Sequence, residues 1–155
     1  QIAGQYEVPE TLLKNINGLR DPADLRPGME LKVVRGPFRA EIDREAGQLV
    51  LFARKLYAGR FPVSVGNDGP LEPGEYKVRD KQPGQTYVTP DGTRVAAGSA
   101  DNPYGRWWLD LGANVSIHES PETLPAHGLG SISLKTADAA DIYGILSVGS
   151  HVQIR

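Results

Sequence analysis

The side chains that could carry out chemistry in this sequence are few, because it contains no cysteine and only three histidines. Without cysteine there is no thiolate nucleophile, no thiolate metal site and no disulfide. His118, His127 and His151 are the groups whose ordinary pKa lies near neutrality. Their spacing lacks the short helical repeat of a zinc site, so we expect no metal ion. A covalent mechanism would therefore depend on a hydroxyl group, and the candidate is Ser131, in the segment GLGSISL.

A serine hydroxyl is a weak nucleophile, because almost none of it is ionised at neutral pH. It must lose its proton to a base during attack. A histidine nitrogen must therefore lie within about 2.6–3.2 Å of the hydroxyl, in a tautomer that a third group holds. Whether Ser131 meets this requirement decides whether the protein is an enzyme, and the sequence leaves that question open.

Length and composition describe one domain of ordinary size with room for a small appendage. The 155 residues are 39% apolar, which is enough for a packed core. The net charge of -2, with acids between the basic residues, argues against a nucleic-acid partner. No apolar run approaches the roughly 18 residues of a membrane span, and no signal peptide is visible. Because the sequence starts at Gln1 without methionine, it is compatible with an export signal that has been removed.

The first 35 residues predict a very small unit made of helix, turn and strand. Residues 9–16, PETLLKNI, are typical of a short helix that begins with proline and carries its apolar residues on one face. Asn17 and Gly18 end this helix, because both residue types tolerate positive φ. Residues 21–28 predict a turn, and the alternating MELKVV at 29–34 predicts a strand.

This order of elements resembles a lysin motif (LysM), a module that packs two helices on a two-stranded sheet. The matching residues are Ile2-Ala3, Tyr6, Val8-Pro9, Leu12-Leu13, residues 16–19 and the segment LRPGMELKV. The resemblance covers all but the first strand and its turn, and it implies binding of N-acetylglucosamine polymers such as peptidoglycan. The alternative is a small helical appendage that docks on the main domain, because a fold alone does not establish a function.

A linker is predicted at Arg35, Gly36 and Pro37, where the composition changes. The chain then divides into a partial LysM-like unit at 1–35 and a main domain at 36–155. The main domain shows short strands separated by Gly, Pro and Asp turns, which favours an all-β sandwich or barrel-like fold. The predicted strands are FRAEID, QLVLFAR, KLYAGRFPVSVG with a bend at Ala58-Gly59, EYKVRD, RWWLDLG, NVSIHES and SHVQIR.

One principal helix is predicted at 136–147, TADAADIYGILS, with Thr136 as its N-cap. Its expected apolar contacts are Ala140, Ile142, Ile145 and Leu146. The fold class is therefore mainly β with one C-terminal helix, preceded by a small α+β unit. Residues 79–106 lack strong periodicity, and we expect them to form a lid or the wall of a cleft; the alternative is a surface loop. Within them, TYVTPDGTRV predicts a small hairpin that turns at Asp91-Gly92.

In order, these pieces resemble the catalytic domain of L,D-transpeptidases, bacterial cell-wall enzymes that cross-link peptidoglycan stem peptides. The resemblance is carried by AEIDREAGQLVLFARKLYAGRFPVSVG, LEPGEYKV, YGRWWLDL followed by SIHES, GSISL, the helix DAADIYGIL and the ending GSHVQIR. It covers residues 38–155. It implies an exported protein of the cell envelope or periplasm, a peptidoglycan-type glycopeptide as partner, and no cofactor.

The sequence departs from the family's pattern where the chemistry would be. Matching GSISL to the family's Gly-Cys-Ile-Arg-Leu aligns Gly130 with the glycine, Ser131 with the nucleophilic cysteine and Ser133 with the arginine. Leu129 then stands where the family usually has a His or Lys. A second alignment matches residues 127–129, His-Gly-Leu, to His-Gly-Cys. We prefer the first alignment, because it keeps the strand-to-helix junction in register.

His118 matches the family's earlier histidine and is the predicted base, although Glu119 replaces a glycine beside it. Glu119 is a poor group to orient this histidine, because adjacent residues on a strand point to opposite faces. Asp110 and Asp101 would serve only if their loop folds over. His127 would replace the function missing at Leu129 if the connection bends inward. The resemblance thus implies a site made of Ser131, His118, Gly130, Ser133 and His127.

Three functions fit these residues. The first, which we prefer, is an envelope protein that binds peptidoglycan-type glycopeptide on a transpeptidase scaffold without its thiol. The loss of both the cysteine and the arginine argues for it, since serine cannot replace a planar bidentate donor. The second is a serine-dependent L,D-transpeptidase, acyl transferase or peptidase with Ser131 as nucleophile and His118 as base. The third is a scaffold that binds no glycan. The sequence does not indicate an oligomeric state.

Overall fold

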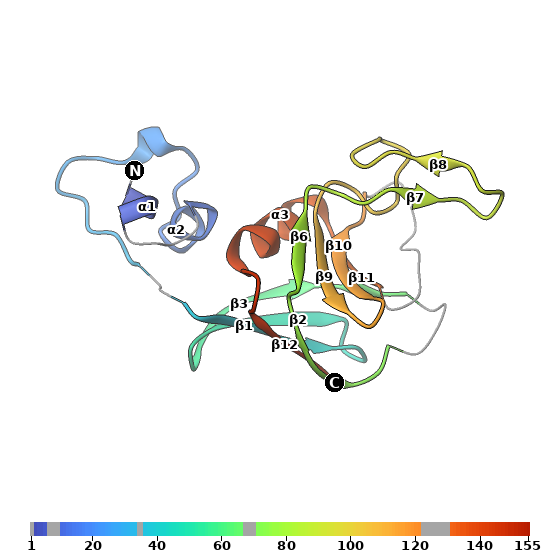
Figure 1. Cartoon of the computed structure of the whole chain (residues 1–155). Helices are drawn as coiled ribbons and strands as arrows, with labels where there is room; N and C mark the ends of the chain where they lie inside the picture. The colour runs from blue at the N-terminus through green and yellow to red at the C-terminus, as the bar shows by residue number, and fades with distance from the viewer. Residues whose placement is uncertain (1, 6–9, 34–35, 67–70, 122–130) are drawn as a thin grey trace.

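The computed structural model describes residues 2–5, 10–33, 36–66, 71–121 and 131–155. It shows a small helical N-terminal unit beside a β-rich main domain with two five-stranded sheets (Figure 1). The predicted fold class, mainly β with one principal C-terminal helix, is confirmed. Over the described ranges, no helix is both long enough and apolar enough to span a membrane.

The first sheet has the strand order β3-β2-β1-β12-β5. Its strands are β1 (Phe38–Asp43), β2 (Gln48–Ala53), β3 (Leu56–Pro62), β5 (Gly74–Lys77) and β12 (His151–Ile154). β1 and β2 form the predicted antiparallel hairpin. β12 lies between β1 and β5 and runs parallel to β1, so the first and last strands of the main domain are neighbours.

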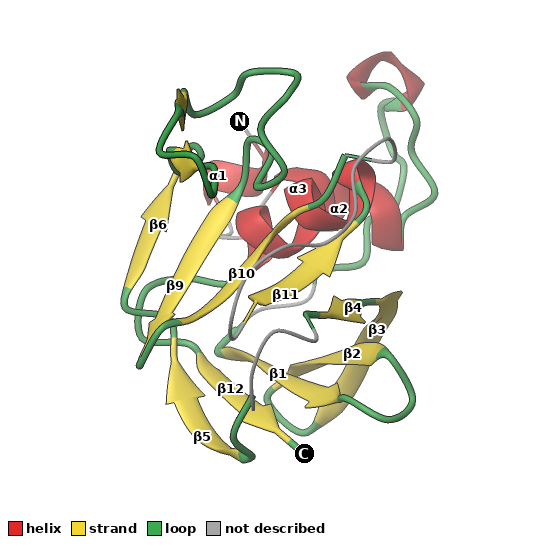
Figure 2. Cartoon of the chain, turned by 90° about the vertical axis from the view of Figure 1, so that its right-hand side faces the viewer, coloured by secondary structure: helices red, strands yellow, loops and turns green. Residues whose placement is uncertain are grey.

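The second sheet has the order β4-β11-β10-β9-β6. Its strands are β4 (Ser64–Val65), β6 (Asp80–Gln82), β9 (Trp108–Gly112), β10 (Val115–Glu119) and β11 (Ser131–Leu134). β10 and β11 are parallel, and the other neighbours are antiparallel. The helix α3 (Thr136–Ile145) follows β11, contacts β10 and β11, and lies behind this sheet in Figure 2.

One hydrophobic core joins both sheets and α3. Because successive strand residues alternate between faces, each sheet turns one apolar face inward. The contributors include Ile42, Leu49 and Leu51 from the first sheet, Leu109, Ile117 and Ile132 from the second, and Ile142 from α3. Full burial of such a side chain contributes about 1.5–3 kcal/mol relative to leaving it exposed. This core covers one face of the second sheet, and the polar side chains of the sheet lie on its other face.

The N-terminal unit contains α1 (Ile2–Gln5), α2 (Glu10–Ile16) and the short 3-10 helix η1 (Pro22–Asp24). The predicted end of α2 is confirmed: Gly18 has φ +65°, and the Leu19 N–H donates to the Lys14 carbonyl at 3.0 Å. α2 packs against α3, where Leu12 is buried in the main core and Ile16 packs beside it. The unit therefore docks on the main domain.

The strand predicted at MELKVV is wrong over its described residues, 29–33, which form no strand. The side chain of Asn17 takes the place of a neighbouring strand. Its Nδ2 donates to the Lys32 carbonyl at 2.9 Å, and the Lys32 N–H donates to its Oδ1 at 2.7 Å. An extended segment whose polar groups are met by a side chain needs no ladder partner.

The main helix begins one residue earlier than predicted. Its N-cap is Lys135 rather than Thr136, whose hydroxyl donates to Glu119 instead. Ala139, rather than the predicted Ala140, is the buried alanine, whereas Ile142 and Ile145 face the core as expected.

Two further details concern the strands. The bend predicted at Ala58-Gly59 takes the form of a β-bulge. β3 continues through both residues, and Ala58 is the extra residue between Gly59, the partner of Leu51, and Tyr57, the partner of Phe52. The hairpin predicted within 79–106 is confirmed as β7 (Tyr87–Val88) paired with β8 (Arg94–Val95). Gly92 has φ +88° at its turn. The strand β6 was not predicted there.

Candidate functional site

Polar side chains occupy one face of the second sheet in two rows. Register partners across β9, β10 and β11 place side by side, in one row, Trp108, His118 and Ser133, and in the next row Asp110, Ser116 and Ser131. The residues between them, such as Leu109, Ile117 and Ile132, face the core. The sheet therefore presents the candidate nucleophile and the candidate base on the same face, as the alternation of strand residues requires.

An open cleft of about 430 Å³ lies beside the second row, and Ser131 forms part of its wall. The rest of the described lining comprises Gln82, Gln85, Tyr104, Trp108, Asp110, Gly112, Ala113, Asn114, Val115 and Ser116. Gln82, Gln85 and Tyr104 come from residues 79–106, so the prediction that this segment forms the wall of a cleft is confirmed. Ser131 itself is only 1% exposed, so almost none of its surface is open to solvent.

Aromatic rings cover His118, which is 1% exposed. Its imidazole stacks on Trp108, with ring centroids 5.5 Å apart and an angle of 18° between planes. Tyr104 meets it edge-on at 5.1 Å, and Tyr87 from the β7–β8 hairpin packs on Tyr104 at 5.3 Å. These rings separate the imidazole from water.

The hydrogen bonds of His118 define its tautomer. Its Nδ1 lies 2.6 Å from the backbone carbonyl of Glu119. A carbonyl can only accept, so Nδ1 carries the proton and Nε2 keeps its lone pair. Nε2 is buried, and no residue in the described part of the chain forms a hydrogen bond with it. The hydroxyl of Ser131 is thus not in hydrogen-bond contact with this base.

Burial sets the charge of His118. It lowers the pKa of the imidazole to about 4, against smaller opposing effects of the Glu119 carbonyl and carboxylate. The ring is therefore neutral at pH 7. A neutral ring with a fixed Nδ1–H is an oriented proton acceptor, but its low pKa makes it a weak one.

The group that orients His118 is a backbone carbonyl, which side-chain patterns could not reveal. Asp110 lies opposite Ser116, one row away, and Asp101 is exposed in its loop. Neither forms a hydrogen bond with the imidazole. The prediction that the Glu119 carboxylate does not orient His118 is confirmed, because that side chain points to other partners.

The buried carboxylate of Glu119 connects the loop before β9 to the start of α3 through hydrogen bonds. It accepts hydrogen bonds from the Arg106 N–H and from the Thr136 hydroxyl, both at 2.7 Å. Gly105 lies against it so closely that a Cβ there would be 2.6 Å from the glutamate side chain. Only glycine fits at that position, where φ is also positive at +61°. This connection fixes the loop that carries Tyr104 over the imidazole.

The remaining predicted site residues divide into one that is described and two that are not. Ser133 is buried opposite His118, and its hydroxyl donates a long hydrogen bond of 3.4 Å to the Ser64 carbonyl. Gly130 and His127 lie outside the described residues, so their roles stay predictions. Leu129 and the second alignment lie there too. In the described ranges no three His, Cys, Asp or Glu side chains are grouped to hold a metal ion.

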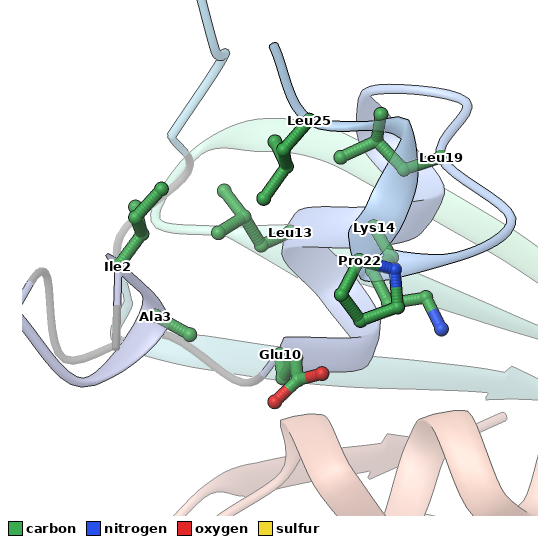
Figure 3. A pocket seen from close by; sticks show the side chains of 8 residues that line it. All are labelled: Ile2, Ala3, Glu10, Leu13, Lys14, Leu19, Pro22 and Leu25. Atoms are coloured by element: carbon green, nitrogen blue, oxygen red, sulfur yellow. The ribbon is translucent and has the colours of Figure 1, made fainter. Parts of the chain in front are cut away.

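A second hollow lies in the N-terminal unit and has a volume of about 450 Å³. Figure 3 shows Leu13, Leu19 and Leu25 converging in it, with Glu10 and Lys14 toward one end. Its lining is mainly apolar, in contrast to the polar cleft of the main domain.

Comparison with known families identifies both parts of the chain. Residues 37–154 match the family described as the L,D-transpeptidase catalytic domain, and residues 1–34 match the LysM domain. The chain belongs to the L,D-transpeptidase family. Both resemblances drawn from the sequence are confirmed. The pairing makes this a peptidoglycan-related protein, and both families are typical of the cell envelope.

Solved structures show the same fold at low sequence identity. An L,D-transpeptidase from Mycobacterium smegmatis superposes with a TM-score of 0.61 and 18% identity, covering 76% of this chain and 58% of its own. L,D-transpeptidase 3 from Mycobacterium tuberculosis superposes with a TM-score of 0.61 and 18% identity, covering 76% of this chain and 60% of that protein. A cysteine-to-serine mutant of an Enterococcus faecium L,D-transpeptidase superposes with a TM-score of 0.59 and 19% identity, covering 76% of this chain and 49% of that protein. The chain thus spans about half to three-fifths of the length of these proteins. No curated protein sequence matches it.

Proposed function

We propose that the main domain binds peptidoglycan stem peptides in its cleft without performing the family's thiol-dependent acyl transfer. One observation carries this proposal: His118 Nε2 has no hydrogen bond to Ser131 or to any other described residue. A serine nucleophile needs a base in contact with it, and the best base has a pKa near the working pH. The pKa of His118 is about 4, and the chain has no cysteine to supply a thiolate.

The cleft is suited to holding a peptide. Gln82 and Gln85 offer amide groups that both donate and accept, and Ser116 offers a hydroxyl. Tyr104 and Trp108 add flat apolar surface beside them. A few convergent polar groups among aromatic rings are typical of ligand pockets. These groups can pair with the amides of an extended peptide without any step of bond making.

The N-terminal unit is proposed to bind the glycan of the same polymer, and the protein to act after export at the cell envelope. The hollow around Leu13, Leu19 and Leu25 supports this, because apolar surface can pack on sugar rings. Docking of α2 on α3 keeps this unit close to the main domain, so one glycopeptide could engage both. We expect N-acetylglucosamine oligomers to bind the full chain and Leu13→Asp to weaken that binding. Met29→Asp, at an exposed position outside the hollow, is the control and should bind normally.

The experiment for the main proposal combines binding with intact mass. We expect the full chain to bind a tetrapeptide stem and to sediment with peptidoglycan, while incubation with the tetrapeptide or a carbapenem adds no mass. Gln85→Trp should weaken tetrapeptide binding by filling the cleft. Gln153→Trp, on the outer face of β12, should not. An adduct on wild-type Ser131, with turnover of the peptide, would contradict the proposal. Absence of binding to both ligands would favour a scaffold.

A second function, serine-dependent acyl transfer or hydrolysis, is favoured by one feature. The Glu119 carbonyl holds His118 in the tautomer that a general base requires, and Nε2 faces no competing partner in the described structure. Apo structures often show longer catalytic hydrogen bonds than substrate complexes do. A peptide that draws Ser131 and His118 together would complete the constellation.

Replacing Ser131 by cysteine separates the two functions. A thiol depends less on a base, because a few per cent is already thiolate at pH 7. If the rest of the site is intact, Ser131→Cys gains a carbapenem adduct that wild type lacks. Ser116→Cys, the neighbour in the same row and cleft, should gain none. Equal labelling of wild type and Ser131→Cys would favour the serine enzyme.

A further inference from the structure

We infer that the cleft selects peptides bearing a side-chain ammonium group, and that Asp110 is the residue that recognises it. This inference rests on the proposed binding of stem peptides, because it names the chemistry of the bound peptide. It assigns Asp110 a role in specificity that differs from the orienting role considered for it in the sequence.

Asp110 is the charged residue of the cleft. Among the described lining residues it alone carries a charge; the others offer amides, hydroxyls, aromatic rings or backbone. Its neighbour across the sheet edge, Asp80, adds a second carboxylate on the same face. The family's arginine position is occupied by the neutral Ser133. The guanidinium of Arg79, which lies against Gly112, is the cation beside these two carboxylates. The carboxylates thus outnumber it, which favours a cationic ligand over an anionic one.

The carboxylate of Asp110 is oriented but not neutralised. Its Oδ1 accepts a hydrogen bond from the Gly112 N–H at 2.8 Å. A carboxylate has about four acceptor positions on its two oxygens, so most of its capacity stays available. The ion pairs found among the described residues do not include Asp110. Arg79, whose guanidinium lies close to Gly112, forms none with it either.

The spacing of the second row predicts the length of the side chain that carries the ammonium. Asp110, Ser116 and Ser131 are register partners on three successive strands. Asp110 and Ser131 are thus two strand spacings apart, about 10 Å. A peptide residue with its carbonyl at Ser131 can reach Asp110 through a four-carbon stem like that of lysine. One hydrogen bond of about 2.9 Å at each end completes the span. A shorter amine would not reach.

The test compares two tetrapeptides that differ in one group. Both are acetyl-capped and carry D-alanine at the fourth position, and the third residue is either lysine or Nε-acetyl-lysine. Binding to the full chain is followed by calorimetry and by the fluorescence of the cleft tryptophan, Trp108. We expect wild type to bind the lysine peptide about tenfold more tightly, the scale of one charge-assisted hydrogen bond. Replacing lysine by the shorter 2,3-diaminopropionate should remove most of this preference.

Asp110→Asn is the decisive variant. Asparagine keeps the shape and still accepts from the Gly112 N–H, but it lacks the charge. We expect its ratio of affinities to fall to about 1. The matched control is Asp101→Asn, which removes the same charge from an exposed loop position outside the described lining, and its ratio should stay near that of wild type.

The outcomes separate this inference from the proposed function. If wild type binds both peptides equally, or Asp110→Asn keeps the preference, the inference is wrong and peptide binding stands. If the full chain binds neither peptide, the proposed function fails and the inference fails with it. If Asp110→Asn does not fold, the inference is tested on wild type instead, by measuring the ratio of the two peptide affinities at increasing salt concentration. The preference should weaken as ionic strength rises, because screening acts on the charge pair alone, and a salt-independent ratio would overturn it.

Discussion

The two five-stranded sheets share a plan but treat their polar faces in opposite ways. Each contains one parallel pair, β1–β12 or β10–β11, and each turns alternate residues into the common core. On the outer face of the first sheet, Arg39, Glu41 and Gln153 remain in contact with solvent. On the second sheet, His118 and Ser131 are buried under aromatic rings and loops.

This difference separates a structural face from a functional one. Burying a polar atom costs free energy unless it finds a partner. The first sheet avoids this free-energy cost because the polar side chains on its outer face stay in contact with water. The second sheet bears this cost, because the buried His118 Nε2 has no hydrogen-bond partner in the described structure. Unsatisfied buried groups and strongly shifted pKa values gather at functional sites, so the comparison points to the second sheet.

The largest expected effect is a difference in stability between two variants, one at Glu119 in the β10–β11 pair and one at Glu41 in the β1–β12 pair. Glu119→Ala would leave the Arg106 N–H and the Thr136 hydroxyl buried without their acceptor, which we expect to cost about 4 kcal/mol of unfolding free energy. Glu41→Ala removes ion pairs with Arg39 and Arg155, whose side chains are exposed, and should cost less than about 1 kcal/mol. Urea unfolding measures both. Equal losses would break the comparison.

The next effect is a pH dependence that belongs to His118. Its folded pKa of about 4 lies below its ordinary 6.5, so the unfolded chain binds a proton more readily. Stability should be flat above pH 6.5 and fall as the pH drops to 4, by about 3 kcal/mol in total. His118→Asn should flatten this window. His151→Asn, on the exposed β12, should keep the wild-type slope, and a flattened slope there would contradict the assignment.

A smaller effect tests the crowding above the second sheet. Gly105 and Gly149 both have positive φ, so alanine at either costs about 1 kcal/mol of backbone strain. A Cβ at Gly105 would also collide with Glu119, whereas one at Gly149 meets nothing within 4 Å. We expect Gly105→Ala to lose about 1–2 kcal/mol more than Gly149→Ala. Thermal and urea unfolding measure both losses of stability. Equal losses would show that the loop around Gly105 moves to accommodate the added methyl group at no cost.

The smallest effect is a predicted equality. Arg106 pairs with Glu119 and Arg155 pairs with Glu41, and their side chains are 64% and 63% exposed. Exposed ion pairs contribute little, so either arginine-to-alanine change should cost less than about 1 kcal/mol. A large loss at Arg106 alone would show that its side chain, and not only its backbone N–H, holds the cover over His118.

The fold was predictable where strand residues alternate strongly. FRAEID, QLVLFAR and SHVQIR each gave a strand close to its observed bounds. The same alternation could not tell that KLYAGRFPVSVG divides between β3 in one sheet and β4 in the other, because period two does not depend on the partner. The strand expected at 29–33 failed because Asn17 satisfies its backbone from outside any ladder.

The site was predictable only in part. The resemblance implied that His118 and Ser131 belong to one site, and the structure places them on neighbouring strands and on the same face of the sheet. The partner of His118 Nδ1 is a backbone carbonyl, which any residue type supplies, so no sequence signal points to it. The position of Asp110 opposite Ser116 depends on a register shift between Val115 and Ser116. That shift arises from backbone pairing and has no signature in the residue types.

The parallel pairing of β1 and β12 has a mechanical consequence. β1 is entered from the N-terminal unit and β12 leads to Arg155, so a pull on these two points loads the hydrogen bonds of the pair together, in shear. The β2–β3 hairpin, pulled apart at its open end where Gln48 pairs with Pro62, would instead open one bond at a time. We expect single-molecule stretching between Pro37 and Arg155 to need a higher force than stretching between Gln48 and Pro62. Equal forces would contradict this. A domain tethered through such a pair would withstand the tension of a wall that swells and contracts.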